Sequence, residues 1–231
     1  MNFIEFIQNN LLHVLPILIS GVFAVAIIFE RSKALIKTYP LQNSIVFFQQ
    51  LKNDLMHGKV KNALSLCEQY GDKPITRLIK TGLLRAHLPE DSIEQALMMS
   101  LGDETRKIQK RTSFLATIAN VATLLGLLGT IAGLIHSFEA VSLADPQQKA
   151  AMLSAGIATA MNATMLGLGV AIPCMVAFSF LMNKANRLVA ELENGAIKTL
   201  DILKQRFYID EVEHSERSST DAPKRPLKSV A

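Results

Sequence analysis

Residues 113–138 read SFLATIANVATLLGLLGTIAGLIHSF, and residues 150–182 read AAMLSAGIATAMNATMLGLGVAIPCMVAFSFLM. Neither stretch contains Asp, Glu, Lys or Arg. About 20 apolar residues in a helix cross the roughly 30 Å hydrocarbon core of a bilayer. Both stretches are long enough for this, and residues 11–29 form a third uncharged stretch that is just long enough. The sequence therefore predicts an all-α integral membrane protein with three transmembrane helices.

Lysine and arginine are unevenly distributed around these spans. None precedes the first span, 14 lie in residues 30–112, one (Lys149) lies between the second and third spans, and nine follow the third. Cytoplasmic loops carry the excess of these residues in membrane proteins. We therefore expect residues 1–10 and the short loop 139–149 to lie outside, and residues 30–112 and those after 182 to be cytoplasmic. This distribution accounts for the net charge of +4 without any nucleic-acid partner.

Residues 30–112 are expected to fold as a small helical bundle in the cytoplasm. Their apolar residues recur every three or four positions, with breaks near Pro40, Gly58 and Pro89. The two clearest apolar stripes are Ile45, Phe48, Leu51 and Leu55, and Ile75, Leu78, Ile79 and Leu83.

The second and third spans are both predicted to extend into the cytoplasm as helices. No proline occurs between Pro89 and Pro146, so we expect one helix to run from the cytoplasm through the second span. The third span continues as a helical stripe through residues 183–213. Residues 214–231 are rich in Ser, Lys, Pro and Asp and are expected to be disordered.

Small residues recur at steps of three or four along the second and third spans. Such faces let helix backbones approach closely, which favours helix association in lipid. We therefore interpret the glycines as helix-packing positions that imply neighbouring helices, and not as a ligand site. These glycines are Gly126, Gly129, Gly133, Gly156 and Gly167.

The same spans carry hydroxyl and amide side chains, namely Thr123 and Thr130 in the second and Thr159, Asn162 and Thr164 in the third. Two interpretations stay open. These groups bond backbone carbonyls or a neighbouring helix, or they line a wet ion pathway. Neither a hydroxyl nor a carboxamide titrates near neutral pH, so a proton-carrying group would have to come from another subunit.

Catalytic and metal-binding patterns are absent from the sequence. Cys67 and Cys174 have neither metal-ligand spacing nor a CxxC arrangement, and the five histidines are scattered. No nucleotide-binding, hydrolase or metalloprotease motif occurs. We expect no enzymatic activity, no metal site and no cofactor.

Two motifs carry a resemblance to a known family. The second span contains Gly126-Leu-Leu-Gly-Thr-Ile-Ala-Gly133 followed by Ser137-Phe138, and the third contains Gly156-Ile-Ala-Thr-Ala-Met-Asn-Ala-Thr164 with Gly167 and Ala171-Ile-Pro173. At these residues the chain resembles the MotA/TolQ/ExbB proton-channel family. Its three spans, with the amino terminus outside, are most similar to the ExbB/TolQ branch.

This resemblance implies a homopentamer in the bacterial inner membrane. The pore would hold the single transmembrane helices of an ExbD/TolR-like partner, whose Asp would be protonated. Proton-motive force would drive a TonB- or TolA-like effector, for transport across the outer membrane or envelope maintenance. Thr130 and Thr164 match family threonines expected to face that Asp. Thr159 stands where the family usually has Glu, which leaves a sodium-coupled divergent paralogue open, as well as a non-conducting membrane scaffold.

Overall fold

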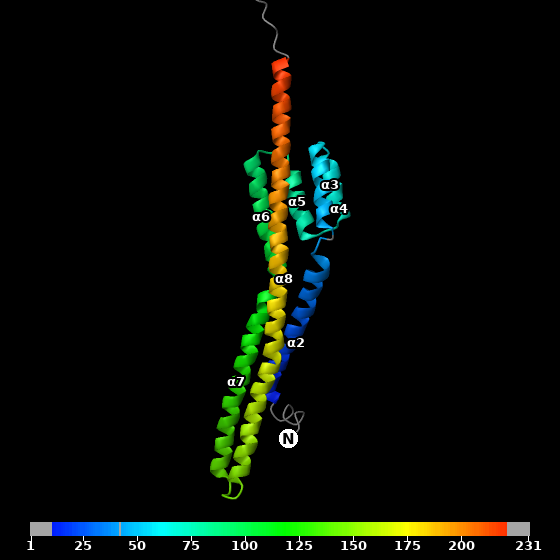
Figure 1. Cartoon of the computed structure of the whole chain (residues 1–231). Helices are drawn as coiled ribbons and strands as arrows, with labels where there is room; N and C mark the ends of the chain where they lie inside the picture. The colour runs from blue at the N-terminus through cyan, green and yellow to red at the C-terminus, as the bar shows by residue number, and fades with distance from the viewer. Residues whose placement is uncertain (1–10, 42, 221–231) are drawn as a thin grey trace, which may run out of the picture. The chain divides into compact units, whose positions relative to one another are not determined.

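The computed structural model describes residues 11–41 and 43–220, and the regular elements within these ranges are all helices (Figure 1). Three stretches are long and apolar enough to cross a membrane, namely Val14–Thr38, Glu90–Leu143 and Lys149–Tyr208. The predicted all-α class with three candidate spans is confirmed. In chain order the elements are α2 (Leu11–Lys33), the π-helix η1 (Ala34–Thr38), α3 (Ser44–Met56), α4 (Val60–Gln69), α5 (Pro74–Leu84), α6 (Glu90–Gln109), α7 (Thr112–Leu143) and α8 (Lys149–Thr220).

The chain divides into two compact units. The first, which we call the span unit, comprises Met1–Thr38 and Ile108–Leu188. It contains α2, α7 and the first part of α8. The second, which we call the loop unit, comprises Tyr39–Lys107 and Val189–Ala231. It contains α3, α4, α5, most of α6 and the rest of α8.

The expectation of one helix from Pro89 through the second span was wrong. α6 ends at Gln109, and α7 begins after a break at Lys110 and Arg111. Arg111 has a left-handed backbone, with φ 63° and ψ −11°, a conformation that side chains other than glycine rarely adopt. Neither residue breaks helices by its own propensity, and contacts distant in the sequence are made on both sides of the break.

Two adjacent residues of α2 make those contacts. The guanidinium of Arg31 donates a hydrogen bond to the carbonyl of Ile108, which lies in the last turn of α6. A cation at this position offsets the negative end of the helix dipole. The guanidinium of Arg111 donates to both carboxylate oxygens of Glu30, at 3.0 and 2.8 Å. The end of α6 and the start of α7 are thus each bonded to α2.

The loop unit has an apolar core to which all of its helices contribute. The stripe at Ile75, Leu78, Ile79 and Leu83 is buried, as expected. In the first stripe Leu51 and Leu55 are fully buried and Phe48 is partly buried, but Ile45 is 73% exposed and Phe47 is fully buried, so the buried register of α3 is Phe47, Leu51 and Leu55. The aromatic ring of Phe47 packs edge-on against the rings of Phe48 and Tyr70, which fixes this register.

Close contacts join α5 to both of the long helices in this unit. A Cβ atom added at Gly82 of α5 would lie 2.8 Å from the side chain of Leu97 in α6. A Cβ atom added at Gly195 of α8 would lie 2.9 Å from Ile75 in α5 and 3.3 Å from Phe48 in α3. The helices between the first and second spans therefore pack together with the part of α8 that lies in this unit.

Helix α8 is uninterrupted from Lys149 to Thr220, passing through Pro173. Residues 183–213 are helical within it. Disorder was expected from residue 214, but α8 continues to Thr220, and no proline occurs between Pro173 and Pro223 to interrupt it. The rest of the expected tail, residues 221–231, lies outside the described residues.

Candidate functional site

The small residues of α7 and α8 face each other within one chain. A Cβ atom added at Gly167 would lie 2.6 Å from the carbonyl oxygen of Ala122 and 2.9 Å from the Cα of Gly126. One added at Gly129 would lie 2.7 Å from the Cβ of Ala163. The two backbones are therefore in direct contact at the middle of the predicted spans.

The same close approach extends toward the far ends of the two helices. A Cβ atom added at Gly133 would lie 3.1 Å from the Cα of Ala160, and one added at Gly156 would overlap the hydroxyl of Ser137. Ser137 is buried and donates a hydrogen bond to the carbonyl of Gly133 at 2.6 Å. The structure thus places all five predicted packing glycines at the α7–α8 contact, where each one meets a neighbour in its own chain.

Three of the predicted pathway threonines bond within their own helices. Thr123 donates to the carbonyl of Ala119 at 3.0 Å, and Thr159 donates to the carbonyl of Ala155 at 3.0 Å. Thr130 donates at 2.6 Å to the carbonyl of Leu127. This is the local bonding expected of Ser and Thr in apolar helices.

Thr164 differs because its bond crosses between helices. Its hydroxyl donates to the carbonyl of Gly126 in α7 at 3.2 Å, which the absence of a side chain at Gly126 makes accessible. Thr159 lies five residues away, on a different side of α8. Asn162 is partly buried, and its amide forms no hydrogen bond with residues 11–41 or 43–220. The structure therefore brings Thr164 against α7 and leaves Thr159 and Asn162 apart from that contact.

These hydrogen bonds determine whether the threonine hydroxyls can donate a hydrogen bond to a ligand or only accept one. A hydroxyl has one hydrogen and two lone pairs. When the hydrogen is donated to a backbone carbonyl, the oxygen retains only acceptor capacity for any other group. Thr123 and Thr130 lie two turns apart, on the same side of α7. This side of the helix pair therefore presents acceptors to water, a protonated carboxyl group or a cation.

One histidine lies near the end of the second span. His136 is exposed and its Nδ1 lies 3.4 Å from a carboxylate oxygen of Glu139, which is also exposed. Between residues 113 and 138, and between 150 and 182, there is no carboxylate or amine. Within the described ranges, no group of three His, Cys, Asp or Glu side chains is arranged to hold a metal ion.

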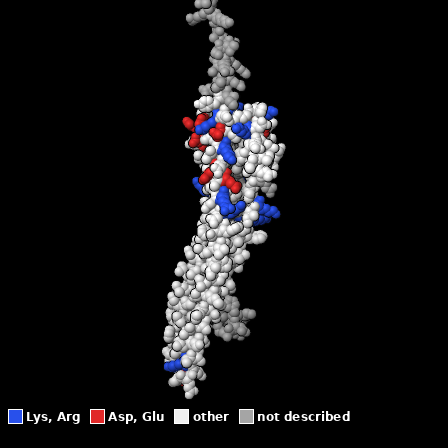
Figure 2. All heavy atoms as spheres, in the orientation of Figure 1, with Lys and Arg blue, Asp and Glu red and all other residues white. Residues whose placement is uncertain are grey.

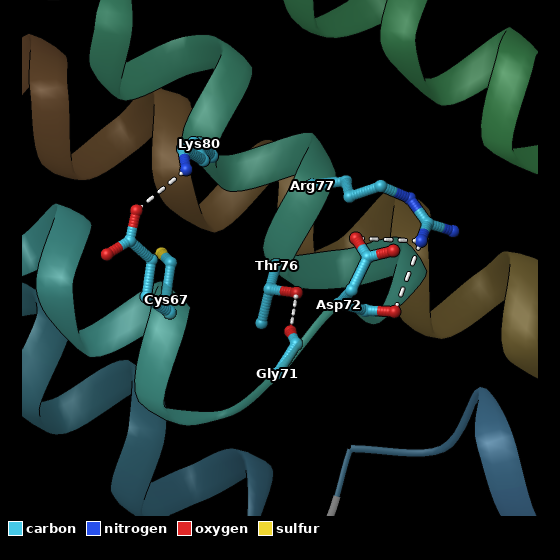
Figure 3. A pocket seen from close by; sticks show the side chains of 7 residues that line it. Cys67, Gly71, Asp72, Thr76, Arg77 and Lys80 are labelled. Atoms are coloured by element: carbon cyan, nitrogen blue, oxygen red, sulfur yellow. Dashed lines mark hydrogen bonds and ion pairs between the residues drawn. The ribbon is translucent and has the colours of Figure 1, made fainter.

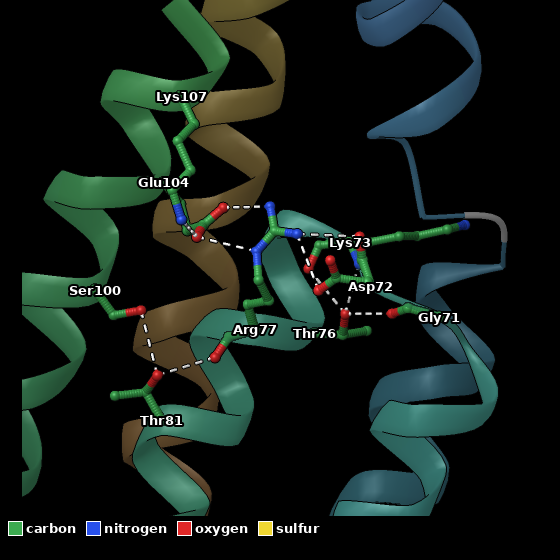
Figure 4. A network of polar contacts seen from close by, with 9 residues as sticks. All are labelled: Gly71, Asp72, Lys73, Thr76, Arg77, Thr81, Ser100, Glu104 and Lys107. Carbon is green, nitrogen blue, oxygen red and sulfur yellow. Dashed lines mark hydrogen bonds and ion pairs between the residues drawn. The ribbon is translucent and has the colours of Figure 1, made fainter.

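The loop unit contains a polar network that the sequence did not single out (Figure 4). Glu104 is its centre, with a side chain only 4% exposed. Arg77 donates to both of its carboxylate oxygens, at 3.0 and 2.6 Å, and Lys107 donates to one of them at 2.7 Å. Burial alone would raise the carboxyl pKa of Glu104, but the hydrogen bonds from Arg77 and Lys107 outweigh burial and lower it.

A shallow pocket lies beside this network and contains the buried thiol of Cys67 (Figure 3). Lys80 forms an ion pair with Glu68 at 2.9 Å, and Arg77 forms one with Asp72 at 3.0 Å. Burial raises the pKa of Cys67 to about 11, so its thiol is protonated at neutral pH and is a poor nucleophile. The two ion pairs balance the charges that line this pocket, and because they are partly exposed they contribute little to stability.

The N-terminus of α5 completes the network. The hydroxyl of Thr76 accepts a hydrogen bond from the backbone N–H of Lys73 at 3.0 Å and donates to the carbonyl of Gly71 at 2.7 Å (Figure 4). A spacing of three residues between a cap and its partner is a recognisable pattern at helix starts. Here the usual Ser or Thr cap is replaced by Lys73, which removes the signal that could have revealed this cap in the sequence.

The chain is similar in sequence to known membrane transport proteins. The sequence model of the MotA/TolQ/ExbB proton channel family matches residues 70–194, a range that includes every predicted site residue. The Tol-Pal system protein TolQ of Haemophilus influenzae is 31% identical over 90% of this chain and 96% of its own length. A putative biopolymer transport protein, ExbB-like 3 of Synechocystis, is 28% identical over 89% of this chain and 96% of its own.

Proposed function

Because the chain belongs to the MotA/TolQ/ExbB proton channel family, we propose that it is an ion-channel subunit that couples proton-motive force to mechanical work. Relatives named for the Tol-Pal system and for biopolymer transport support a role in energy-coupled transport. In this proposal the protein is a multi-pass subunit of the bacterial inner membrane and not an enzyme. The distribution of Lys and Arg favours a periplasmic amino terminus and a cytoplasmic carboxyl terminus.

The observation that carries the proposal is the chemistry of the α7–α8 pair. Its hydroxyls donate their hydrogens to carbonyls of the chain and keep only lone pairs for a ligand. Such oxygens stabilise a passing cation or a protonated carboxyl group, but they cannot take up and release a proton near neutral pH. The titrating group must therefore come from a partner.

We propose that this partner is an ExbD/TolR-like protein with a single span that carries an Asp. The chain would assemble as a homopentamer around that span, and a TonB- or TolA-like effector would receive the work. One elementary charge moving across 100 mV releases about 2.3 kcal/mol. A few protons per cycle would supply enough free energy to move the partner.

Thr130 and Thr164 are assigned to the ion pathway, with Thr123, Thr159 and Asn162 contributing further oxygen atoms. Thr130 and Thr123 share one side of α7, and the hydroxyl of Thr164 reaches α7 at Gly126. Thr164 therefore has two functions in this proposal, since its hydrogen bond also joins the two helices.

A second candidate, coupling to sodium, is favoured by Thr159. This residue replaces the Glu that is usual in the family, so the third span has one negative charge fewer and one more neutral oxygen. Hard cations are bound by oxygen ligands, including hydroxyl, carbonyl and water oxygens. The two candidates differ in which gradient drives the channel.

The test is ion flux into liposomes that contain the full chain together with the single-span protein that copurifies with it. We expect Thr130→Val and Thr164→Val each to reduce flux on the order of tenfold, the effect of losing one hydrogen bond of about 1 kcal/mol or more. Thr117→Val is the matched control, because Thr117 lies on an exposed side of α7 away from the α8 contact.

Flux is measured separately under a pH gradient and under a sodium gradient, and the amount of each variant in the membrane is quantified. A response to the sodium gradient alone would replace the proton assignment with the second candidate. Full flux in both threonine variants, or full cation leakage through the chain without its partner, would refute the pathway assignment.

A further inference from the structure

The outer side of α2 and α8 carries an apolar groove that the proposed ion pathway does not use. The groove has a volume of about 430 Å³ and is lined entirely by apolar residues and glycines, together with one thiol. Its walls include Gly21, Val22 and Val25 of α2, and Gly169, Pro173 and Cys174 of α8. Val22 and Val25 are 71% and 66% exposed, so the groove opens outward.

The groove exists because small residues line it on both sides. A Cβ atom added at Gly21 would lie 3.4 Å from Val170, which brings the two helices into contact there. A Cβ atom added at Gly169 would meet nothing within 4 Å. α2 and α8 run side by side in the span unit (Figure 1), and on the face turned toward the viewer in Figure 2 the lower part of the molecule shows almost no charged side chains. In a bilayer, this groove lies at the depth of lipid chains.

Two lysines lie beyond one end of the groove, at similar distances along the helix axes. Lys33 follows Val22 by eleven residues, and Lys184 follows Pro173 by eleven residues. Eleven residues are about three helical turns, so Lys184 lies in line with Pro173, and Lys33 lies in line with Val22 at the exposed rim of the groove. Measured from the Gly21–Val170 contact, Lys33 is about 18 Å and Lys184 about 21 Å farther along the helix axes.

These distances fit the depth of one bilayer leaflet. Half of the hydrocarbon core is about 15 Å thick, and the headgroups lie just beyond it. A lipid chain that fills the groove from this end therefore places its phosphate beside both lysines. Neither Lys33 nor Lys184 forms a salt bridge with residues 11–41 or 43–220. Basic side chains between transmembrane helices are a recurring means of binding anionic headgroups.

We propose that the α2–α8 groove binds an acyl chain of an anionic phospholipid, and that Lys33 and Lys184 bind its headgroup. The lipid comes from the leaflet at the end of the spans where α2 meets the α6–α7 break. This site is separate from the α7–α8 contact, and the proposal holds whichever ion the protein conducts.

The absence of tryptophan from the chain makes a direct test available. Phe29 follows Val22 by seven residues and is 75% exposed, so Phe29→Trp places one indole at the rim of the groove. Phe114→Trp is the matched control. Phe114 is 58% exposed and lies one turn from Arg111, which is bonded to Glu30, so the two indoles lie at similar depths.

Each full-length variant is reconstituted in phosphatidylcholine vesicles that contain a minor fraction of brominated phosphatidylglycerol or brominated phosphatidylcholine. Bromine quenches indole fluorescence at short range. In Phe29→Trp we expect the anionic lipid to bind at least about fivefold more strongly than the zwitterionic one, since each lysine near a membrane surface contributes roughly a fivefold preference. In Phe114→Trp we expect equal quenching by the two lipids.

Charge substitutions then locate the headgroup. Adding Lys33→Gln and Lys184→Gln to Phe29→Trp should abolish the preference for phosphatidylglycerol, whereas adding Lys110→Gln, which removes a charge at similar depth, should preserve it. Equal quenching by the two lipids at position 29, or a preference that survives the double lysine substitution, would overturn the proposal. Absence of quenching by either lipid would also overturn it, because a second copy of the chain would then cover the groove.

Discussion

Replacement of Gly167 by alanine should separate α7 from α8. The added Cβ atom would lie 2.6 Å from the carbonyl oxygen of Ala122 and 2.9 Å from the Cα of Gly126. The first distance is about 0.9 Å shorter than the roughly 3.5 Å of an optimal contact. Both neighbours are backbone atoms that cannot rotate away, so the helices themselves must move apart.

The expected cost follows from the physics of overpacked contacts. Extra methyl groups in a packed interior destabilise proteins by about 1–3 kcal/mol. Alanine also gains about 0.5–1 kcal/mol over glycine inside a helix. Gly169→Ala has the same gain without the clash, because nothing lies within 4 Å of its added Cβ atom. The difference in unfolding free energy between the two variants should therefore be about 2 kcal/mol, with Gly167→Ala the less stable.

The assay is reversible unfolding of the purified full-length chain in mixed micelles, with an increasing fraction of sodium dodecyl sulfate and helix content as the readout. The two substitutions lie two residues apart on one helix, so helix propensity and detergent contacts are closely matched. If Gly167→Ala unfolds at the same detergent fraction as Gly169→Ala, the close packing of the two backbones is refuted.

The remaining predictions concern polar groups. Glu104→Gln should lower the free energy of unfolding at neutral pH by about 1–2 kcal/mol, since Arg77 and Lys107 lose a buried carboxylate partner but keep access to water. The folded-state pKa of Glu104 is lowered, so its contribution to the free energy of unfolding is complete above the unfolded carboxyl pKa of about 4.3 and is lost as the pH falls through the folded value. The unfolding free energies of the two proteins should therefore converge in acid. A difference that stays constant with pH would contradict this. Thr112→Val should leave the free energy of unfolding unchanged or raise it, because the buried Thr112 hydroxyl has no hydrogen-bond partner among the described residues. Thr76→Val should lower the free energy of unfolding by about 1–2 kcal/mol, because it removes two hydrogen bonds at the start of α5. If the two threonine substitutions change the thermal unfolding temperature equally, the Thr76 hydroxyl does not stabilise the start of α5 as described.

The helical class and the small faces of the spans follow from local sequence patterns. An uncharged stretch of sufficient length identifies a candidate span whatever its neighbours are, and glycine and alanine at helical spacing mark the sides where backbones can meet. The stripe at Ile75, Leu78, Ile79 and Leu83 was likewise predictable, because one period describes the whole of α5.

The α6–α7 break was not predictable in this way. Lys110 and Arg111 favour helix as much as most residues do, and no glycine or proline accompanies them. The contacts that flank the break are made by Glu30 and Arg31, which precede their partners by 81 and 77 positions. A single sequence holds no record of such long-range pairs, and only the folded chain shows that they coincide.

The hydroxyl groups show a similar limit. Spacing identified Thr123, Thr130, Thr159 and Thr164, but it left open whether each hydroxyl bonds its own helix, another helix or a ligand. The structure distinguishes Thr164, whose bond crosses to Gly126, from the others, whose bonds stay local. That distinction depends on which glycine lies opposite, which is a property of the helix pair and not of either span alone.

The two contacts made by Glu30 and Arg31 have a mechanical consequence. These residues are neighbours on one rigid helix, so their separation is fixed while α2 stays folded. A shift of Arg111 would pull on Glu30, and a shift of Ile108 would pull on Arg31. The two backbone segments that flank the break are thus tied to the same two-residue segment of the first span, so neither can move relative to α2 without straining a contact in that segment.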